Sequence, residues 1–118
     1  MSMPTWCAVA CVIASGACVS PDERPATWSY VHAAILVPSC ATATCHSSIS
    51  ERGGVVLEDP DDAYQTLIDG GYVVPGDDNS TLLFLLSGEE RVRMPPDAPL
   101  PEADVELIRT WIREGAEP

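Results

Sequence analysis

Two cysteines separated by four residues, with a histidine directly after the second, constrain this chain more than any other feature. The segment reads Cys40-Ala41-Thr42-Ala43-Thr44-Cys45-His46. That order of residues is how a haem is attached covalently, because two thiols bond to the porphyrin vinyl groups and the adjacent imidazole is held under the iron. The segment is therefore a candidate haem-attachment motif.

The spacing within this motif differs from the usual one, which has two residues between the cysteines. On a helix, residues three apart in sequence lie roughly 60° from each other, whereas residues five apart lie about 140° apart. A regular helix therefore cannot aim both sulfurs at one porphyrin edge. We expect the extra residues to bulge out, which small Ala and Thr side chains allow.

The same residues have other interpretations. A disulfide between Cys40 and Cys45 closes a short loop and leaves His46 as an ordinary surface residue. A zinc site needs two further ligands, for which only His32 and carboxylates remain. Thiol–disulfide exchange is disfavoured, because its motif has two residues between the cysteines.

The length and composition indicate one small acidic domain, with residues left for tails at its ends. The chain has 118 residues, of which 46% are hydrophobic, and a bound haem would supply part of the apolar core that so short a chain needs. Its net charge is −12, from 18 acidic and 6 basic residues. This charge argues against nucleic acid or anionic lipid as a partner, and it favours a cationic partner surface or simply solubility.

The first residues have the pattern of an export signal. An apolar run from Trp6 to Ala17 is shorter than the ~20 residues that span a bilayer, and it closes on small residues before a cysteine. It resembles a bacterial lipoprotein signal, which implies a lipid anchor on Cys18, with Cys11 as an alternative cleavage site. We therefore expect a signal peptide at 1–17, a linker at 18–26 and one domain at 27–118.

Capping residues and apolar periodicity predict four helices in that domain. Thr27 caps a helix that ends or kinks just before the motif, because Pro38 disfavours helix at Val37, and Asp59-Pro60 starts a second helix. Ser80, with Asn79, caps a third helix. The predicted ranges are 28–36, about 60–69, 81–86 and 102–114, with short extended runs at 55–57 and 72–74.

Two side chains outside the motif are further candidate ligands. His32 is either a partly exposed helix residue or a second haem ligand. Met94 is the first methionine after the N-terminal segment, and two prolines follow it on a loop that they stiffen. It is either core filler or a thioether held at a fixed point.

Four segments, taken in order, resemble the small class I-like c-type cytochrome domains of bacterial exported lipoproteins, including the planctomycete type. They are Cys40 to His46, Gly53-Gly54-Val55-Val56-Leu57, Val74-Pro75-Gly76-Asp77 with Ser80-Thr81-Leu82-Leu83, and Met94-Pro95 with Leu107 to Ala116. The resemblance implies a mostly α fold of about four short helices around one haem c, with an optional short extended pair. It also implies thioether bonds at Cys40 and Cys45, with His46 and Met94 as axial iron ligands.

The function implied by this resemblance is single-electron transfer rather than enzyme catalysis. With His46 and Met94 both bound, the iron has no open position for a substrate. The expected location is the periplasm or outer membrane, and the expected partner is a redox protein with a cationic docking surface. The alternatives are a haem-free exported module with a Cys40–Cys45 disulfide, and a haem enzyme or gas sensor with an open sixth position.

Overall fold

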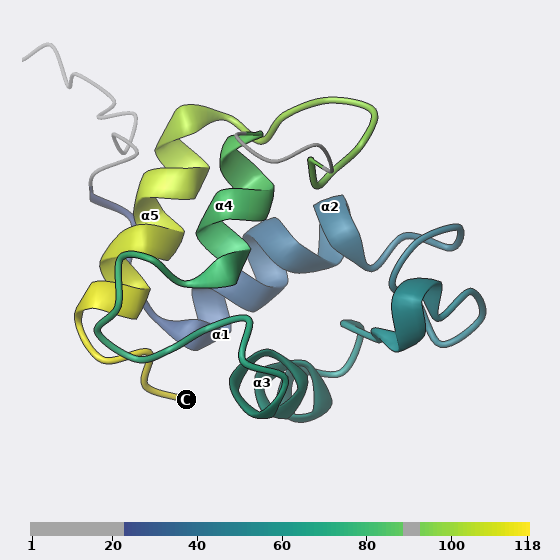
Figure 1. Ribbon diagram of the computed structural model, residues 1–118, viewed down its shortest axis with the longest axis horizontal. Helices are drawn as coiled ribbons and strands as arrows, with labels where there is room; N and C mark the ends of the chain where they lie inside the picture. Colours follow the sequence, from purple (N-terminus) through teal and green to yellow (C-terminus); the bar gives the residue numbers. More distant parts are fainter. Residues whose placement is uncertain (1–22, 89–92) are drawn as a thin grey trace, which may run out of the picture.

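The first helical segment runs without a break into the first cysteine of the motif (Figure 1). The computed structural model describes residues 23–88 and 93–118. The segment consists of α1 (Trp28–Tyr30), a π-helical stretch (Val31–Leu36) and α2 (Val37–Cys40). Thr27 caps its start as expected, because its side-chain oxygen accepts a hydrogen bond from the backbone N–H of Tyr30.

Of the two expectations for this helix, an end or a kink just before the motif, the end is wrong, because the helix passes through Pro38 and includes Cys40. Proline has no N–H to donate, and in a regular α-helix its ring clashes with the carbonyl four residues earlier. The disturbance here takes the form of wider π turns, in which the N–H of Ala41 donates to the carbonyl of Leu36 at 3.2 Å. The helix therefore continues as far as Cys40, the first residue of the motif.

The second and last helices form where their capping residues predict. α3 (Pro60–Asp69) begins after Asp59, whose carboxylate accepts hydrogen bonds from the backbone N–H groups of Asp61 and Asp62 at 2.9 and 3.0 Å. α5 (Glu102–Arg113) has acidic residues in its first turn and Arg113 in its last, which complements the helix dipole.

The third helix, α4 (Thr81–Ser87), begins after Ser80, whose hydroxyl does not cap it. The Ser80 side chain is buried, donates to the carbonyl of Asp77 at 2.8 Å and accepts the N–H of Val74 at 3.0 Å. It closes the turn before the helix, so the predicted helix start is confirmed and the predicted cap is wrong.

The core lies where the first helical segment packs against α5, with α4 beside α5 (Figure 1). The rings of Trp28 and Trp111 stack at its centre with centroids 5.2 Å apart. The largest fully buried apolar side chains are Trp111, Ile35, Leu36, Ile108, Ile112, Val31 and Val73. The mostly helical fold is confirmed. No β-strand occurs in residues 23–88 or 93–118, so the runs 55–57 and 72–74 do not form the optional extended pair.

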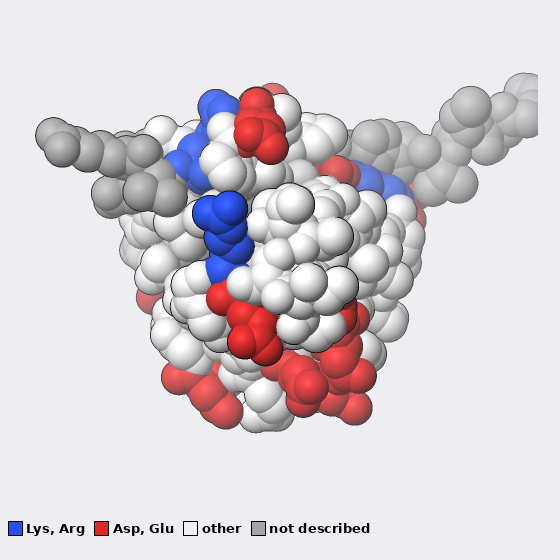
Figure 2. Space-filling view, turned by 90° about the vertical axis from the view of Figure 1, so that its right-hand side faces the viewer, with Lys and Arg blue, Asp and Glu red and all other residues white. Residues whose placement is uncertain are grey.

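Acidic side chains gather along the lower edge of the molecule in Figure 2, where α3 lies. The exposed acidic residues at and before its first turn are Glu58, Asp59, Asp61 and Asp62. Within the part of the chain that the structure describes, none of the helices has the length and apolar character needed to cross a membrane.

Candidate functional site

The residues between the two cysteines form a closed loop beside the end of α2. The backbone N–H of Cys45 donates to the carbonyl of Thr42 at 3.0 Å. The N–H of His46 reaches back to the carbonyl of Cys40, also at 3.0 Å. Residues 41–44 thus bulge out of the helical path, as expected from their spacing, and the backbone at His46 is tied to the helix end.

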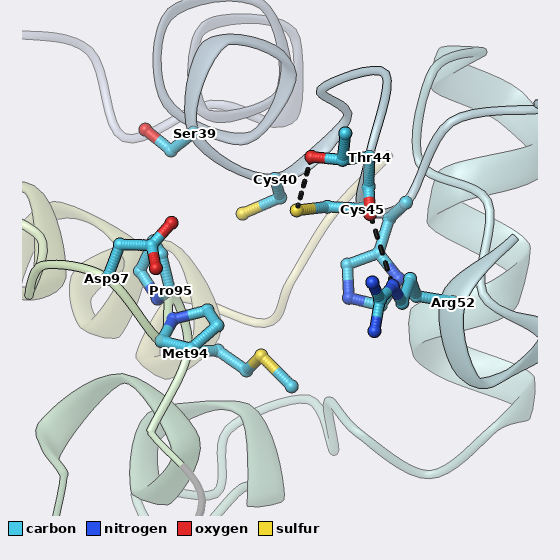
Figure 3. A pocket seen from close by; sticks show the side chains of 10 residues that line it. Ser39, Cys40, Thr44, Cys45, Arg52, Met94, Pro95 and Asp97 are labelled. Carbon is cyan, nitrogen blue, oxygen red and sulfur yellow. Dashed lines mark hydrogen bonds between the residues drawn. The ribbon is translucent and has the colours of Figure 1, made fainter. Parts of the chain in front are cut away.

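Both cysteines border the same cavity. In Figure 3 their sulfurs project from one wall, while Met94 and Asp97 occupy the opposite wall. Both cysteines are free and partly buried. The structure therefore brings together the two thiols that a regular helix would separate.

The two thiols differ in acidity. Burial raises the pKa of Cys40 to about 11, and the nearby Cys45 contributes in the same direction. The pKa of Cys45 is lowered, first by a hydrogen bond from Thr42 and then by one from Thr44, whose hydroxyl oxygen lies 3.7 Å from the sulfur. Cys45 is consequently the more reactive thiol, because the thiolate is the nucleophile.

The imidazole of His46 is oriented by the backbone behind it. Its Nδ1 lies 3.1 Å from the carbonyl oxygen of Val55. A carbonyl oxygen only accepts, so Nδ1 is the donor, and in the neutral ring Nε2 keeps its lone pair. The N–H of Leu57 donates to the His46 carbonyl at 2.8 Å, which ties the same segment to the histidine a second time.

Met94 is held on a loop that is fastened to α4. Its N–H donates to the carbonyl of Leu85 at 2.9 Å. Arg93 donates from its side chain to the carbonyls of Pro95 and Pro96 at 3.4 and 3.3 Å. The loop that carries the thioether is therefore braced by its own neighbours, in keeping with the stiffness that its prolines predict.

Two cavities meet between the motif and Met94. One has a volume of about 280 Å³ and the other about 430 Å³, near the range of roughly 300–1,000 Å³ that is usual for small-molecule sites. Both are bordered by Cys40, His46, Arg52 and Met94. The larger cavity is otherwise mainly apolar, and its remaining lining residues are Gly53, Val55, Leu57, Leu67, Tyr72, Leu82, Leu85 and Leu86.

Comparison with known families agrees with this arrangement. Residues 43–98 match the family model described as Planctomycete cytochrome C. This segment, just under half of the chain, resembles a planctomycete-type cytochrome c domain. The matched residues begin after Cys40 and include Cys45, His46 and Met94. No curated protein and no solved structure matches the chain. The likeness of this segment to a cytochrome family points to haem binding and electron transfer.

His32 is not brought to the other candidate ligands. Its side chain is 5% exposed, so the expectation of a partly exposed residue is wrong. Its Nε2 lies 2.9 Å from the carbonyl oxygen of Leu57, and its ring centroid lies 5.3 Å from that of Trp28. It borders neither of the two cavities, and it acts as a hydrogen-bonded core residue.

The zinc interpretation of the motif finds no support in the geometry. Among residues 23–88 and 93–118, no group of three or more His, Cys, Asp or Glu side chains is arranged to hold a metal ion. A structural zinc site almost always has four protein ligands.

Sequence reasoning did not single out Arg52 and Ser47. Arg52 borders both cavities, and its Nε donates to the carbonyl of Thr44 at 3.2 Å. Ser47 directly follows the motif, and its side chain is 1% exposed. The available signal was weak, namely a lone cation before Gly53-Gly54 and a serine among other serines.

Proposed function

We propose that this chain is a monohaem c-type cytochrome that carries single electrons in the bacterial cell envelope. The observation that carries this proposal is that Cys40, Cys45, His46 and Met94 all border one cavity. Two thiols, an imidazole and a thioether are the protein groups that a covalently attached, His/Met-ligated haem requires. The match to a cytochrome family supports the same function.

The residues around the cavity fit a haem by their chemistry. The larger of the two cavities has mainly aliphatic walls, including Leu67 and Leu82, which suit an apolar macrocycle. The bond between Nδ1 of His46 and Val55 leaves the other ring nitrogen for a metal. Both thiols are in the free form that addition to a vinyl group requires.

Each of the four residues then has a defined role. Cys40 and Cys45 hold haem c through thioethers, and His46 and Met94 are the two axial ligands. When bound, the haem supplies an iron that changes between its ferrous and ferric states by one electron. Two side-chain ligands leave no coordination position for a substrate or a gas, which favours electron transfer. A thioether ligand also raises the reduction potential relative to a second histidine.

Charge and the N-terminal pattern support a location and a kind of partner. A net charge of −12 favours a redox partner protein with a cationic docking surface and disfavours nucleic acid. The expected signal peptide at 1–17 and most of the linker at 18–26, including the lipid-bearing Cys18, lie outside the described residues. With the domain at 27–118, they support export to the periplasm or outer membrane, with membrane contact only through the lipid anchor.

Spectroscopy of the full chain tests this function. The protein is produced in a bacterium that expresses a covalent haem-attachment system, and its haem is quantified as the pyridine haemochrome. We expect one haem per chain that stays with the polypeptide on a denaturing gel. Replacing both Cys40 and Cys45 by Ala should remove the covalent haem, whereas Ile49→Ala, at a position that is 84% exposed, should retain it.

The main competing function is a haem-free exported module with a Cys40–Cys45 disulfide. The structure brings the two thiols close enough to influence each other's ionisation, which is also what a disulfide needs. A purified chain with that disulfide and no bound haem would contradict the cytochrome proposal and favour this module.

A further inference from the structure

Ser47 is hydrogen-bonded to the loop between the cysteines. The Ser47 hydroxyl donates to the carbonyl of Ala43 at 3.3 Å. The same oxygen accepts the backbone N–H groups of Ile49 and Ser50, each at 3.3 Å. Ser50 also donates from its hydroxyl to the Ala43 carbonyl. One buried side chain thus joins the loop to the turn that follows the motif.

Arg52 supports the other half of the loop. Its Nε donates to the carbonyl of Thr44 at 3.2 Å, as the dashed line in Figure 3 shows. Its backbone N–H donates to the carbonyl of Cys45 at 3.1 Å. Both bonds end on the residues that immediately precede His46, and the Arg52 side chain borders both cavities.

These contacts matter because the loop has to place both cysteine sulfurs on one side, as a helical turn does in the usual motif. With two intervening residues, the helix itself places both sulfurs on one side. With four, the sulfur of Cys45 faces the cavity only while residues 41–44 stay folded. An unsupported loop of small Ala and Thr residues would sample many conformations, and each carbonyl that is bonded removes part of that freedom.

We propose that Ser47 and Arg52 are positioning residues that make this widely spaced motif competent for double attachment of haem. This inference rests on the proposed function and deepens it. In each attachment the S–H bond adds across a vinyl C=C bond, so that sulfur bonds to one carbon and the hydrogen goes to the other. No group leaves and no net oxidation occurs, so the two sulfurs need only be reduced and correctly placed.

The test compares matched pairs of variants of the full chain, produced with the haem-attachment system. Ser47→Ala is paired with Ser48→Ala, which changes the exposed neighbouring serine. Arg52→Leu is paired with Arg113→Leu. Arg113 is an exposed arginine of α5 that bonds Asp78, away from the cavity. The measurement is the ratio of singly to doubly attached haem among haem-bearing molecules, by mass spectrometry of the haem peptide.

We expect mostly doubly attached haem in the parent chain and in both controls. In Ser47→Ala and Arg52→Leu the singly attached fraction should rise about fivefold, the population change that the loss of one hydrogen bond of about 1 kcal/mol produces. The haemochrome band should move to longer wavelength as one vinyl group remains. Arg52→Lys should restore part of the double attachment, because its ammonium group can still donate to Thr44.

A purely structural role would lower the yield of haem-bearing protein without changing this ratio. Parent-like ratios in both Ser47→Ala and Arg52→Leu would overturn the inference, as would a parent chain that attaches haem through one sulfur. Arg52 is exposed, so its variant reports on the ratio even where Ser47→Ala folds poorly. A parent chain with no haem would instead contradict the proposed function itself.

Discussion

Nδ1 of His46 lies 3.1 Å from the carbonyl oxygen of Val55, so the ring is oriented before any ligand arrives. The acceptor is a backbone atom, so no side-chain substitution at position 55 removes it directly. A histidine with its tautomer fixed in this way presents Nε2 to a metal without first paying for reorientation. Met94 is fixed similarly, through its own N–H and the carbonyl of Leu85.

Replacing Met94 by Ala should remove the distal ligand while leaving the haem attached. We expect the near-infrared sulfur-to-iron band of the ferric protein to disappear and the potential to fall by on the order of 0.1 V, since axial ligands strongly set haem potentials. Absorption spectroscopy and a redox titration measure both, with Ile49→Ala as the control. An unchanged ferric spectrum would instead favour a haem enzyme or gas sensor with an open sixth position.

Replacing His32 by Leu should destabilise the fold without changing the iron ligands. The substitution leaves the buried carbonyl of Leu57 without its partner, which costs about 1–3 kcal/mol of unfolding free energy. Urea denaturation measures this loss, and Ala34→Ser, at an exposed position of the same helical segment, should change stability by less than about 0.7 kcal/mol. Loss of an axial-ligand signal in His32→Leu would contradict the assigned core role.

The haem-free, reduced chain should be alkylated faster at Cys45 than at Cys40. Near pH 8, close to the ordinary thiol pKa of about 8.5, the lowered pKa of Cys45 gives it more thiolate. Cys40, with its pKa raised to about 11, stays protonated there, so the ratio of the two rates should fall as the pH rises toward that value. Peptide mapping after timed alkylation measures the ratio.

The same alkylation in denaturant provides the control for this prediction. Unfolding removes both the burial of Cys40 and the hydrogen bonds to Cys45, so the two rates should become similar. Faster reaction of Cys40 in the folded chain would show that burial does not govern its acidity.

Replacing Ile108 by Ala should cost about 2–5 kcal/mol of unfolding free energy, because its side chain is fully buried on α5 against the other helices. Ile49→Ala removes the same atoms at an exposed position and should change stability by less than about 0.5 kcal/mol. Denaturant titration of the two variants measures the difference. Equal losses in both would mean that α5 does not supply the core.

Reduction or oxidation by small ions should depend on their charge. A cationic reagent is attracted by a protein of net charge −12, so its rate should fall as salt is added, whereas the rate of an anionic reagent should rise. Between about 0.01 M and 0.15 M ionic strength the Debye length falls from about 30 Å to about 8 Å. Stopped-flow rates over this range measure both effects, and the opposite signs would argue against a cationic docking partner.

The helix boundaries of α3 and α5 were predictable because local chemistry determines them. Asp59, followed by Pro60, accepts the free backbone N–H groups in the first turn of α3. The apolar residues of α5 recur with the helical period and form one face that is buried. The order of the motif, Gly53-Gly54 and Met94 carried the family resemblance that named the candidate haem ligands, whose roles stay predictions. These features need only short-range contacts or a family pattern.

Other features were not predictable because they depend on partners far away in the sequence. Pro38 signals a helix end, and only the tertiary structure shows that π turns carry the helix through it. His32 is buried because Leu57 and Trp28 surround it, and neither contact has a local signature. Ser80 uses its hydroxyl on the preceding turn, where it accepts the N–H of Val74 and donates to the carbonyl of Asp77.

The leucines that face the cavity have a consequence for the life of the protein in the cell. Leu67, Leu82 and Leu85 line space that side chains do not fill, and a chain of this length has few other apolar contacts to rely on. Whatever occupies that space adds its binding energy to the folded state. A chain that fails to receive its guest therefore opens more often and is degraded faster by proteases, so that loading and survival are coupled.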